Sequence, residues 1–320
     1  MATYKGIKGF KVQSLASDPT VIEGQIWYNT ASNTVKYDAV GAGSWSSSGA
    51  MITSRRGMAS AGTYNAALSM GGTPTPASVK TESYNGSTWT EMADLNNARY
   101  ELGGAGTSTA ALAFGGASSN LDYTETFDGT SWTEVNVLNT GRQGTSGCGA
   151  TNTAAICVGG SNPGASALVE SWNGTGWTEI QAINTAREFL SSTGSSTSAV
   201  TVGGLPPPSG TGETETWNGS TWTEEEDLNT ARYAAAAAGA QTVALAIGGY
   251  TTTLVTNVES WDGSAWTEVA DIATAKNYKG AAATQSSTTN AVTFGGGTPV
   301  TDVTEVWDGT PAVVRTVATS

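Results

Sequence analysis

Short apolar stretches alternate with polar, glycine-containing turns along the chain from residue 51 onward. One ten-residue stretch shows the pattern well, because Glu259-Ser260-Trp261 and Trp266-Thr267-Glu268 read as two strands joined through Asp262-Gly263. The Asp-Gly dipeptide predicts a tight type I′ hairpin turn, which needs positive φ angles. Near-copies begin at Glu82, Glu125, Glu170 and Glu215, and a truncated copy begins at Glu305. The hairpin is therefore part of an internal repeat, and the repeat predicts the fold.

Each repeat also contains a pair of glycines after a short apolar strand. The pairs are Gly71-Gly72, Gly115-Gly116, Gly159-Gly160, Gly203-Gly204, Gly248-Gly249 and Gly295-Gly296, about 45 residues apart along the sequence. A cation opens the first strand of each unit, namely Arg56, Arg99, Arg142, Arg187, Arg232 and Lys276. A glutamate opens the third strand, namely Glu82, Glu125, Glu170, Glu215, Glu259 and Glu305. Four short antiparallel strands in such a unit are typical of a propeller blade.

Residue size along the unit agrees with this arrangement. The first two strands are rich in Ala and Gly, as expected where strands crowd toward a central axis, and the last two carry large aromatic residues for the wider space between blades. The run Ala234–Ala238 favours helix by propensity alone. We nevertheless predict a strand there, because the equivalent positions in other units are rich in Gly and Ser.

The predicted fold class is all-β: a six-bladed β-propeller of four-stranded antiparallel blades. The N- and C-terminal strands would close it, with Trp45 pairing beside Val303–Asp308, since the last repeat lacks its own Trp strand. The alternative is a seven-bladed propeller. In that version residues 6–48 form a degenerate first blade and Val313-Val314-Arg315 completes the last.

The order of Arg, Gly-Gly, an aromatic residue followed by Asn or Asp, and then Trp resembles the kelch repeat across residues 51–309. WD-repeat propellers are disfavoured, because their Gly-His element needs a histidine and the chain has none. The galactose-oxidase branch of kelch-like propellers carries copper on histidine and tyrosine, so that site cannot be transferred here. We therefore expect no metal and no cofactor.

Residues 1–44 differ from the repeats and are expected to form an N-terminal β-hairpin attachment segment, with the propeller spanning 45–320. Gly24–Thr30 and Asn33–Asp38 read as a hairpin around Ala31-Ser32-Asn33. This hairpin and the later Trp45 resemble a short module of bacteriophage tail-fibre and other virion proteins. The alternative is an extra hairpin that caps the main domain.

Charge and composition narrow the possible partners. The net charge is −13 with only 14 basic residues, which argues against nucleic acid and anionic membranes. No stretch approaches a membrane span, and the start of the chain lacks the apolar region of a signal peptide. The absence of histidine removes the commonest general base and metal ligand. No convergent carboxylate pair replaces it, so we predict that the protein is not an enzyme.

Two sets of residues are candidate sites. The repeated cations and glutamates predict a structural ring of ion pairs, with an anion site at the channel mouth as the alternative. The loops after each Gly-Gly pair vary between units, and variable loops on a rigid scaffold commonly carry recognition. The candidate ligand-facing residues are Pro206, Pro207, Pro208, Tyr250, Thr251, Asn162 and Asn120.

Two cysteines, Cys148 and Cys157, fall on neighbouring strands of one unit. A two-residue turn at Asn152-Thr153 would place them opposite each other. They are either two small core residues or a cross-strand disulfide.

These observations lead to an expected function. The protein would be a virion component made without a signal peptide, a phage tail-fibre or receptor-binding protein whose propeller loops touch a host-surface ligand such as a glycan. Its other partners would be virion proteins. The alternatives are a purely structural or decorating virion propeller and a polysaccharide-active enzyme.

Overall fold

The computed structural model describes residues 13–17, 26–39, 43–73, 76–117, 122–206, 209–283, 288–309 and 313–316. These residues form strands and turns without a helix, so the all-β prediction is confirmed for the described chain. It follows that they contain no helix that could cross a membrane. The chain divides into two compact units, one of Met1–Gly43 with Gly309–Ser320 and one of Ser44–Asp308.

The smaller unit holds one sheet in the order β1-β2-β3-β28. Its strands are β1 (Gln13–Leu15), β2 (Ile26–Asn29), β3 (Thr34–Ala39) and β28 (Val313–Thr316). The predicted hairpin between β2 and β3 is confirmed, and Asn29 Oδ1 closes its turn by accepting from the N–H groups of Ala31 and Ser32 at 3.0 Å. Residues 24 and 25 of the expected first strand lie outside the described residues.

Two expectations about the chain ends are wrong. Residues after 308 were assigned to the propeller, but β28 pairs with β3 in the smaller unit. The seven-bladed alternative used Val313–Arg315 to complete the last repeat sheet. That sheet is instead completed by β4 (Ser44–Ser47), which pairs with β27 (Thr304–Asp308) and places Trp45 opposite Trp307. The edge that Val313–Arg315 would have used is therefore occupied.

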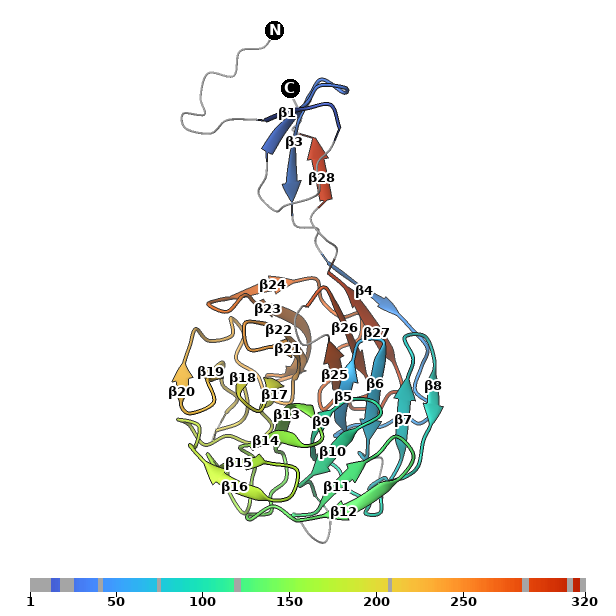
Figure 1. Ribbon diagram of the computed structural model, residues 1–320, viewed down its shortest axis with the longest axis vertical. Helices are drawn as coiled ribbons and strands as arrows, with labels where there is room; N and C mark the ends of the chain where they lie inside the picture. The colour runs from blue at the N-terminus through green and yellow to red at the C-terminus, as the bar shows by residue number, and fades with distance from the viewer. Residues whose placement is uncertain are drawn as a thin grey trace. The chain divides into compact units, whose positions relative to one another are not determined.

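Ser44–Asp308 is a β-propeller of repeated four-stranded antiparallel sheets arranged around a common centre (Figure 1). The innermost strands are β5 (Ala59–Thr63), β9 (Gly103–Gly106), β13 (Ser146–Thr151), β17 (Ser191–Ser195), β21 (Ala236–Ala240) and β25 (Gly280–Ala283). The second strands are β6 (Ala66–Met70), β10 (Ala111–Phe114), β14 (Ala154–Val158), β18 (Ser198–Val202), β22 (Val243–Tyr250) and β26 (Asn290–Phe294).

The outer half of each sheet contains the hairpin that the sequence repeats. The third strands are β7 (Thr81–Tyr84), β11 (Thr124–Phe127), β15 (Val169–Trp172), β19 (Thr214–Trp217), β23 (Leu254–Trp261) and β27. The fourth strands are β8 (Trp89–Glu91), β12 (Trp132–Val135), β16 (Trp177–Ile180), β20 (Trp222–Glu224), β24 (Trp266–Val269) and β4. The prediction of strand for the alanine run is confirmed, since β21 contains most of it.

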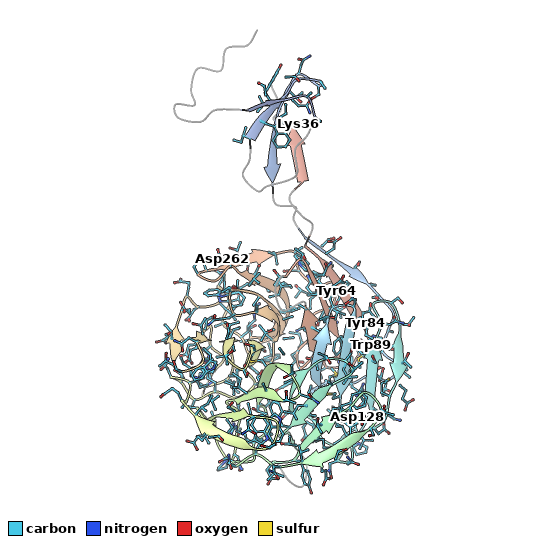
Figure 2. All side chains as sticks on the ribbon, viewed as in Figure 1. Lys36, Tyr64, Tyr84, Trp89, Asp128 and Asp262 are labelled. Carbon is cyan, nitrogen blue, oxygen red and sulfur yellow. The ribbon has the colours of Figure 1, made fainter. Side chains whose placement is uncertain are left out.

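The outer hairpin turn differs from the type I′ turn predicted for it. Trp261 and Trp266 are the last paired residues, and within the Asp262–Ala265 connection only Gly263 has positive φ, at 96°. Asp262 Oδ1 accepts from the N–H groups of Ser264 and Ala265 at 2.9 Å. These bonds lower the pKa of Asp262 and let an Asx-type turn form without a left-handed Asp. Figure 2 shows Asp262 and the equivalent Asp128 at the periphery of the propeller.

Neighbouring sheets are held together by buried tryptophans. The indole N–H of Trp132 donates to Thr81 Oγ1 at 3.2 Å, and that of Trp177 donates to Thr124 Oγ1 at 3.0 Å, each in the preceding sheet. Near the axis the spacing is tighter. A Cβ on Gly104 would lie 2.9 Å from Ala59 Cβ, so only glycine fits there without movement. Large residues outside and small ones inside therefore match the wedge shape of the gaps, as predicted.

Candidate functional site

A buried ion pair joins the start of each sheet to its third strand. Its cation and glutamate are almost completely excluded from solvent, as for Arg99 and Glu125, both 0% exposed. The pairs are Arg55–Glu82 at 2.9 Å, Arg99–Glu125 at 3.0 Å, Arg142–Glu170 at 2.8 Å, Arg187–Glu215 at 2.5 Å, Arg232–Glu259 at 2.9 Å and Lys276–Glu305 at 3.1 Å. Burial lowers the pKa of Arg99, and the Glu125 carboxylate opposes that shift.

The assignment of Arg56 to these pairs is wrong, because Arg55 occupies the equivalent place. Arg55 donates to Gly71 O, and Arg99 and Arg187 donate to Gly115 O and Gly203 O, each across 16 residues. That constant separation is a signal in the sequence that identifies Arg55. Arg56 instead donates to Thr298 Oγ1 at 2.8 Å, and its guanidinium lies 5.8 Å from the ring centre of Tyr278.

The glutamates also hold the linkers that connect consecutive sheets. Glu125 Oε2 accepts from Asn96 N at 2.7 Å and from Asn96 Nδ2 at 2.8 Å, and the same Nδ2 donates to Trp132 O. Leu95 N donates back to Val79 O in the preceding sheet. Each ion pair thus lies within one sheet and fixes the linker that arrives from the sheet before it.

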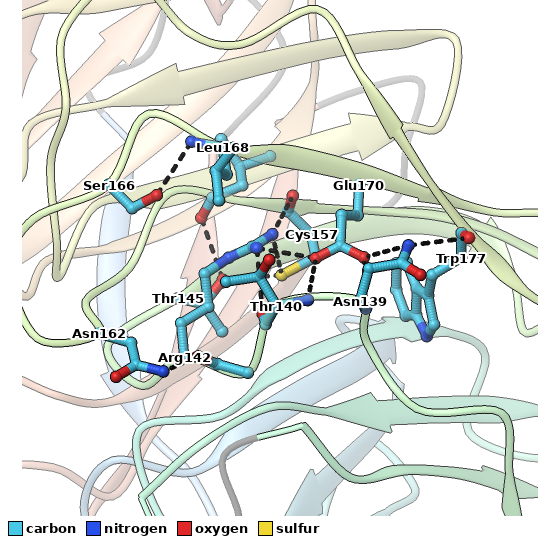
Figure 3. A network of polar contacts seen from close by, with 12 residues as sticks. Asn139, Thr140, Arg142, Thr145, Cys157, Asn162, Ser166, Leu168, Glu170 and Trp177 are labelled. Carbon is cyan, nitrogen blue, oxygen red and sulfur yellow. Dashed lines mark hydrogen bonds and ion pairs between the residues drawn. The ribbon is translucent and has the colours of Figure 1, made fainter.

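The Arg142 site shows how these buried polar groups bind one another (Figure 3). Arg142 Nη1 donates to Glu170 Oε1 at 2.8 Å, and Arg142 Nη2 lies 3.2 Å from Cys157 Sγ. Thr145 Oγ1 is 3.0 Å from the same sulfur. Burial raises the pKa of the Cys157 thiol, and the adjacent Arg142 partly offsets that shift. With the surrounding groups bound to one another, this position stabilises the fold.

Cys148 and Cys157 are both free and buried. Their strands pair Cys148 with Ile156 and Gly147 with Cys157, so the two cysteines are not opposite each other. A bulge between Cys148 and Thr151 sets this register. The structure therefore has the two small core residues and not the disulfide.

A closed cycle of six backbone hydrogen bonds surrounds the axis. It uses the residue two positions after each paired cation: Gly57, Glu101, Gly144, Phe189, Ala234 and Tyr278, here called the axial ring. Each N–H donates to the carbonyl of the preceding ring residue, from 2.6 Å for Glu101 N to Gly57 O to 2.9 Å for Tyr278 N to Ala234 O, and Gly57 N closes the cycle on Tyr278 O. All six have φ between 50° and 64°.

Four of these six residues are not glycine, although L-residues rarely adopt this conformation. For bulky residues such as Phe189 and Tyr278 it is a true outlier. Strained backbone of this kind clusters at functional sites. The axial ring is therefore the strongest candidate site in the described chain.

The axial ring lines a cavity of about 120 Å³ that continues inward between the innermost strands. Ser60, Gly104 and Gly147 border both this cavity and a second one of about 60 Å³ further along the axis. The wall is built from glycine, alanine and serine, so its narrow part offers little side-chain chemistry. Larger and charged side chains occur only at the axial-ring end.

Aromatic and charged side chains gather at that end. We call them the mouth cluster: Arg56, Glu101, Glu188, Phe189, Tyr233, Tyr250 and Tyr278. The ring centres of Phe189 and Tyr278 are 5.3 Å apart with an edge-to-face angle of 89°, and those of Tyr233 and Tyr250 are 5.4 Å apart. Burial raises the pKa of Glu101 to about 7; Glu188 adds to the shift and Arg56 opposes it. Burial also raises the pKa of Tyr278.

The predicted recognition loops lie beside this cluster. Isolated bridges pair Glu188 with Leu205 and Tyr233 with Tyr250, which brings the residue after Gly-Gly next to the residue before the axial ring. Tyr250 ends β22 and pairs with Leu254, so Thr251 belongs to a tight hairpin and not to an open loop. Pro206 O accepts from Ser209 N at 3.1 Å.

Asn162 has its own turn contacts, since its Nδ2 donates to Gly141 O at 2.6 Å. Pro207, Pro208 and Asn120 lie outside the described residues. Of the predicted loop residues, Tyr250 is the one whose side chain joins the mouth cluster. Sequence reasoning missed Glu101, Glu188, Phe189, Tyr233 and Tyr278. The sequence feature that could have identified them is the change of residue type, from repeat to repeat, at the first and second positions after the repeated cation.

Comparison with models of known protein families and with curated proteins finds no match to this chain. The assignment to a β-propeller therefore rests on the structure, and the comparisons lend no support to the kelch or tail-fibre resemblance. Among the described residues there is no group of three or more acidic or cysteine side chains that could hold a metal ion.

Proposed function

We propose that the chain is a six-bladed, kelch-type propeller that acts without catalysis as a virion-associated binding protein, presenting its axial-ring face to a host-surface ligand. Support for the closed six-bladed form comes from β4 completing the sheet of β27 and from the cycle of backbone hydrogen bonds. Further support is the donation from Trp89 Nε1 to Thr304 Oγ1 at 2.9 Å, which links the first repeat sheet to the last.

One observation supports the proposed binding function. Residue types vary between repeats much more at one end of the sheets than at the other. At one end the turns repeat, with Asn85, Asp128, Asn173, Asn218 and Asp262 each accepting backbone hydrogen bonds in the same way. At the other end the residues around the axial ring differ from sheet to sheet and leave a lined cavity. Variation confined to one face of a regular scaffold is typical of recognition.

The test is a binding assay of the purified protein on bacterial cells and isolated surface glycans. We expect saturable binding that is lost when segments 205–212 and 250–256 are exchanged for the equivalent segments of other repeats. The matched control is Asn173→Asp, which reproduces a natural variation of the repeated turn and should bind normally. Binding that survives the exchange, or that is lost equally in the control, would contradict recognition by this face.

The structural alternative makes a different prediction. A propeller that only builds or decorates a particle would bind no cell or glycan, and both of its faces would be covered by other virion proteins in the assembled particle. Proximity labelling of the particle, read at the mouth cluster, distinguishes the two because an attachment protein leaves that face open to solvent.

A further inference from the structure

The mouth cluster contains a carboxylate that the fold leaves unused. Each repeated glutamate has a paired cation, and Glu125 accepts from Asn96 N, Asn96 Nδ2 and Arg99 Nη2. Glu101 is half-buried, yet no residue that the structure describes donates a hydrogen bond to its carboxylate or lies within ion-pair distance of it. A half-buried carboxylate without a protein partner keeps only part of its hydration, so a ligand or a proton stabilises it there.

The surroundings of Glu101 favour a cation as that ligand. Phe189 and Tyr278 line the same cavity as Glu101, and the ring centres of Tyr278 and Tyr233 lie 5.3 Å and 6.4 Å from that of Phe189. Aromatic faces attract ammonium and guanidinium groups, most strongly where water is excluded. The protein already uses this property once, because the Arg56 guanidinium lies 5.8 Å from the centre of the Tyr278 ring.

The balance of charged side chains in the mouth cluster also favours a cationic ligand. Glu101 and Glu188 supply two carboxylates against the single Arg56 guanidinium, and the chain as a whole carries −13. Lys279 also lines the cavity, but its Nζ donates to Lys276 O at 2.8 Å. Burial, together with Lys276 and Arg232, lowers the pKa of Lys279 well below its ordinary value, which disfavours its charged form. The mouth therefore has room for one more positive charge.

We infer that the mouth cluster binds a primary ammonium group carried on a saccharide, an amino sugar, with Glu101 as its counter-ion and the Phe189, Tyr233 and Tyr278 rings against its body. The saccharide part rests on the proposed function. It is also favoured by the adjoining segments, which are rich in Ser, Thr, Pro and Asn and offer hydroxyl and amide partners to a polyhydroxylated ring.

The direct test is calorimetric titration of the full chain at pH 7 with four probes: glucosamine, glucose, N-acetylglucosamine and n-propylammonium. We expect glucosamine to bind at least tenfold more tightly than each of the other three. Equal affinity for glucose or N-acetylglucosamine overturns the need for a positive charge. Equal affinity for n-propylammonium overturns the saccharide.

Variants locate the binding. Glu101→Gln should weaken glucosamine binding at least tenfold, and Phe189→Leu should weaken it several-fold. The matched control is Glu224→Gln on the exposed strand β20, which should leave affinity unchanged. Unchanged affinity in Glu101→Gln overturns the inference.

A further measurement uses the unaltered protein, so its result does not depend on whether a variant folds. Bringing a cation to Glu101 displaces the proton that it holds near pH 7, so titration in buffers of different ionisation enthalpy should reveal proton release. The other titratable or charged groups facing Glu101 are Arg56, Glu188, Tyr233 and Tyr278, and burial raises the pKa of both tyrosines further above this pH. Binding of glucosamine without proton release contradicts the role of Glu101.

The outcomes separate this inference from the function on which it rests. Cell or glycan binding together with no preference for glucosamine overturns the amino-sugar site and leaves the recognition function standing. Preference for glucosamine without any cell binding supports the site and overturns the host-surface role.

Discussion

Glu101, Phe189, Ala234 and Tyr278 adopt a backbone conformation that glycine adopts freely, as Gly57 and Gly144 do at the equivalent positions. For L-residues this conformation costs about 1 kcal/mol or more each. The cost is offset by the hydrogen bond that each N–H makes to the neighbouring repeat. Keeping side chains at four such positions has no benefit for the ring itself, which points to a role for those side chains.

A pair of substitutions at neighbouring alanines measures this strain. Ala234→Gly should leave the free energy of unfolding unchanged or raise it by up to about 1 kcal/mol, since glycine removes the left-handed penalty. Ala236→Gly, in strand β21, should lower it by about 1 kcal/mol, because there the backbone is extended and glycine only adds freedom to the unfolded chain. Equal destabilisation in both, measured by urea unfolding, would show that residue 234 is unstrained.

The raised pKa of Glu101 predicts a pH dependence of stability. Since its pKa in the folded protein is about 7, above its ordinary 4.5, the folded state favours the protonated form. The stability contributed by that proton is complete below about pH 4.5 and is lost as the pH rises through 7. Glu101→Gln should therefore match the parent protein at pH 4 and exceed it at pH 8.

We expect a gain of about 1–2 kcal/mol at pH 8 after allowance for solvent screening. Thermal unfolding across this pH range measures it, with Glu224→Gln as the exposed control. A difference between Glu101→Gln and the parent that is the same at pH 4 and pH 8 would falsify the assignment.

At the scale of elements, the linkers between sheets are hydrogen-bonded on both sides. A linker such as Leu95–Arg99 is bound on one side to the preceding sheet through Val79 O and on the other to Glu125. The buried Arg therefore does more than neutralise a glutamate, because its position also fixes where the next innermost strand begins.

Removing one partner of such a buried pair should be severe. Arg99→Met leaves Glu125 buried without its cation, and we expect a loss of about 3–5 kcal/mol in the free energy of unfolding. Arg99→Lys should lose less, since Lys276 fills the equivalent place at 3.1 Å from Glu305. Lys80→Met breaks only the exposed pairs with Glu91 and Asp94 and should leave urea unfolding unchanged. A loss of unfolding free energy in Arg99→Met as small as that in Lys80→Met would mean that the charge of Arg99 does not contribute to stability.

The repeat made the elements predictable from sequence, and its exceptions mark where prediction failed. Strand order and the strand character of the Ala234–Ala238 run followed from alignment of the units, and β21 contains residues 236–238 of that run. Arg55 and Arg56 are adjacent cations at the same boundary, so residue type alone does not separate them, whereas the 16-residue separation from Gly71 and the ion pair with Glu82 do. The turn type predicted at Asp262 is wrong. The Asp262 side chain accepts the backbone hydrogen bond from Ser264, so the turn forms without a positive φ at Asp262.

At the scale of the whole molecule, a discontinuous sheet joins the two ends of the propeller. β4 comes before the first innermost strand and β27 after the last, and their register places Trp45 opposite Trp307, with ring centres 5.3 Å apart. Trp45 Nε1 also donates to Ala270 O at 3.0 Å, so the strand is anchored to the preceding sheet as well. Pairing with β4 covers the edge of β27 that would otherwise be exposed.

Two truncations test the proposed closure. Residues 44–309 should unfold cooperatively as a monomer, because they retain all four strands of the last sheet. Residues 49–309 lack β4, so the edge of β27 is exposed and we expect a lower melting temperature and aggregation. Size-exclusion chromatography and thermal unfolding distinguish the two. Identical behaviour would mean that β4 does not close the propeller.

The candidate site was much less predictable than the fold. Tyr250 was named from loop variability, whereas Glu101, Phe189 and Tyr278 sit at one position in three different units and meet only around the axis. Residues about 88 and 89 apart along the chain become neighbours through closure of the whole ring. No local sequence pattern predicts that these residues are neighbours. When the repeats are aligned, the only sign is that the residue type at this position differs from one repeat to the next.

The cycle of hydrogen bonds has an electrostatic consequence. Each peptide group carries a dipole, and in a helix such dipoles align and add. In the axial ring the donors follow one another head to tail around a circle, so their tangential components point in all directions and cancel. The backbone hydrogen bonds therefore hold the six ring residues together, and the tangential components of their peptide dipoles add no net field at the entrance. Glu101, Glu188 and Arg56 are charged side chains at this entrance, so substitutions there should change its electrostatic potential while the backbone hydrogen bonds of the axial ring stay in place.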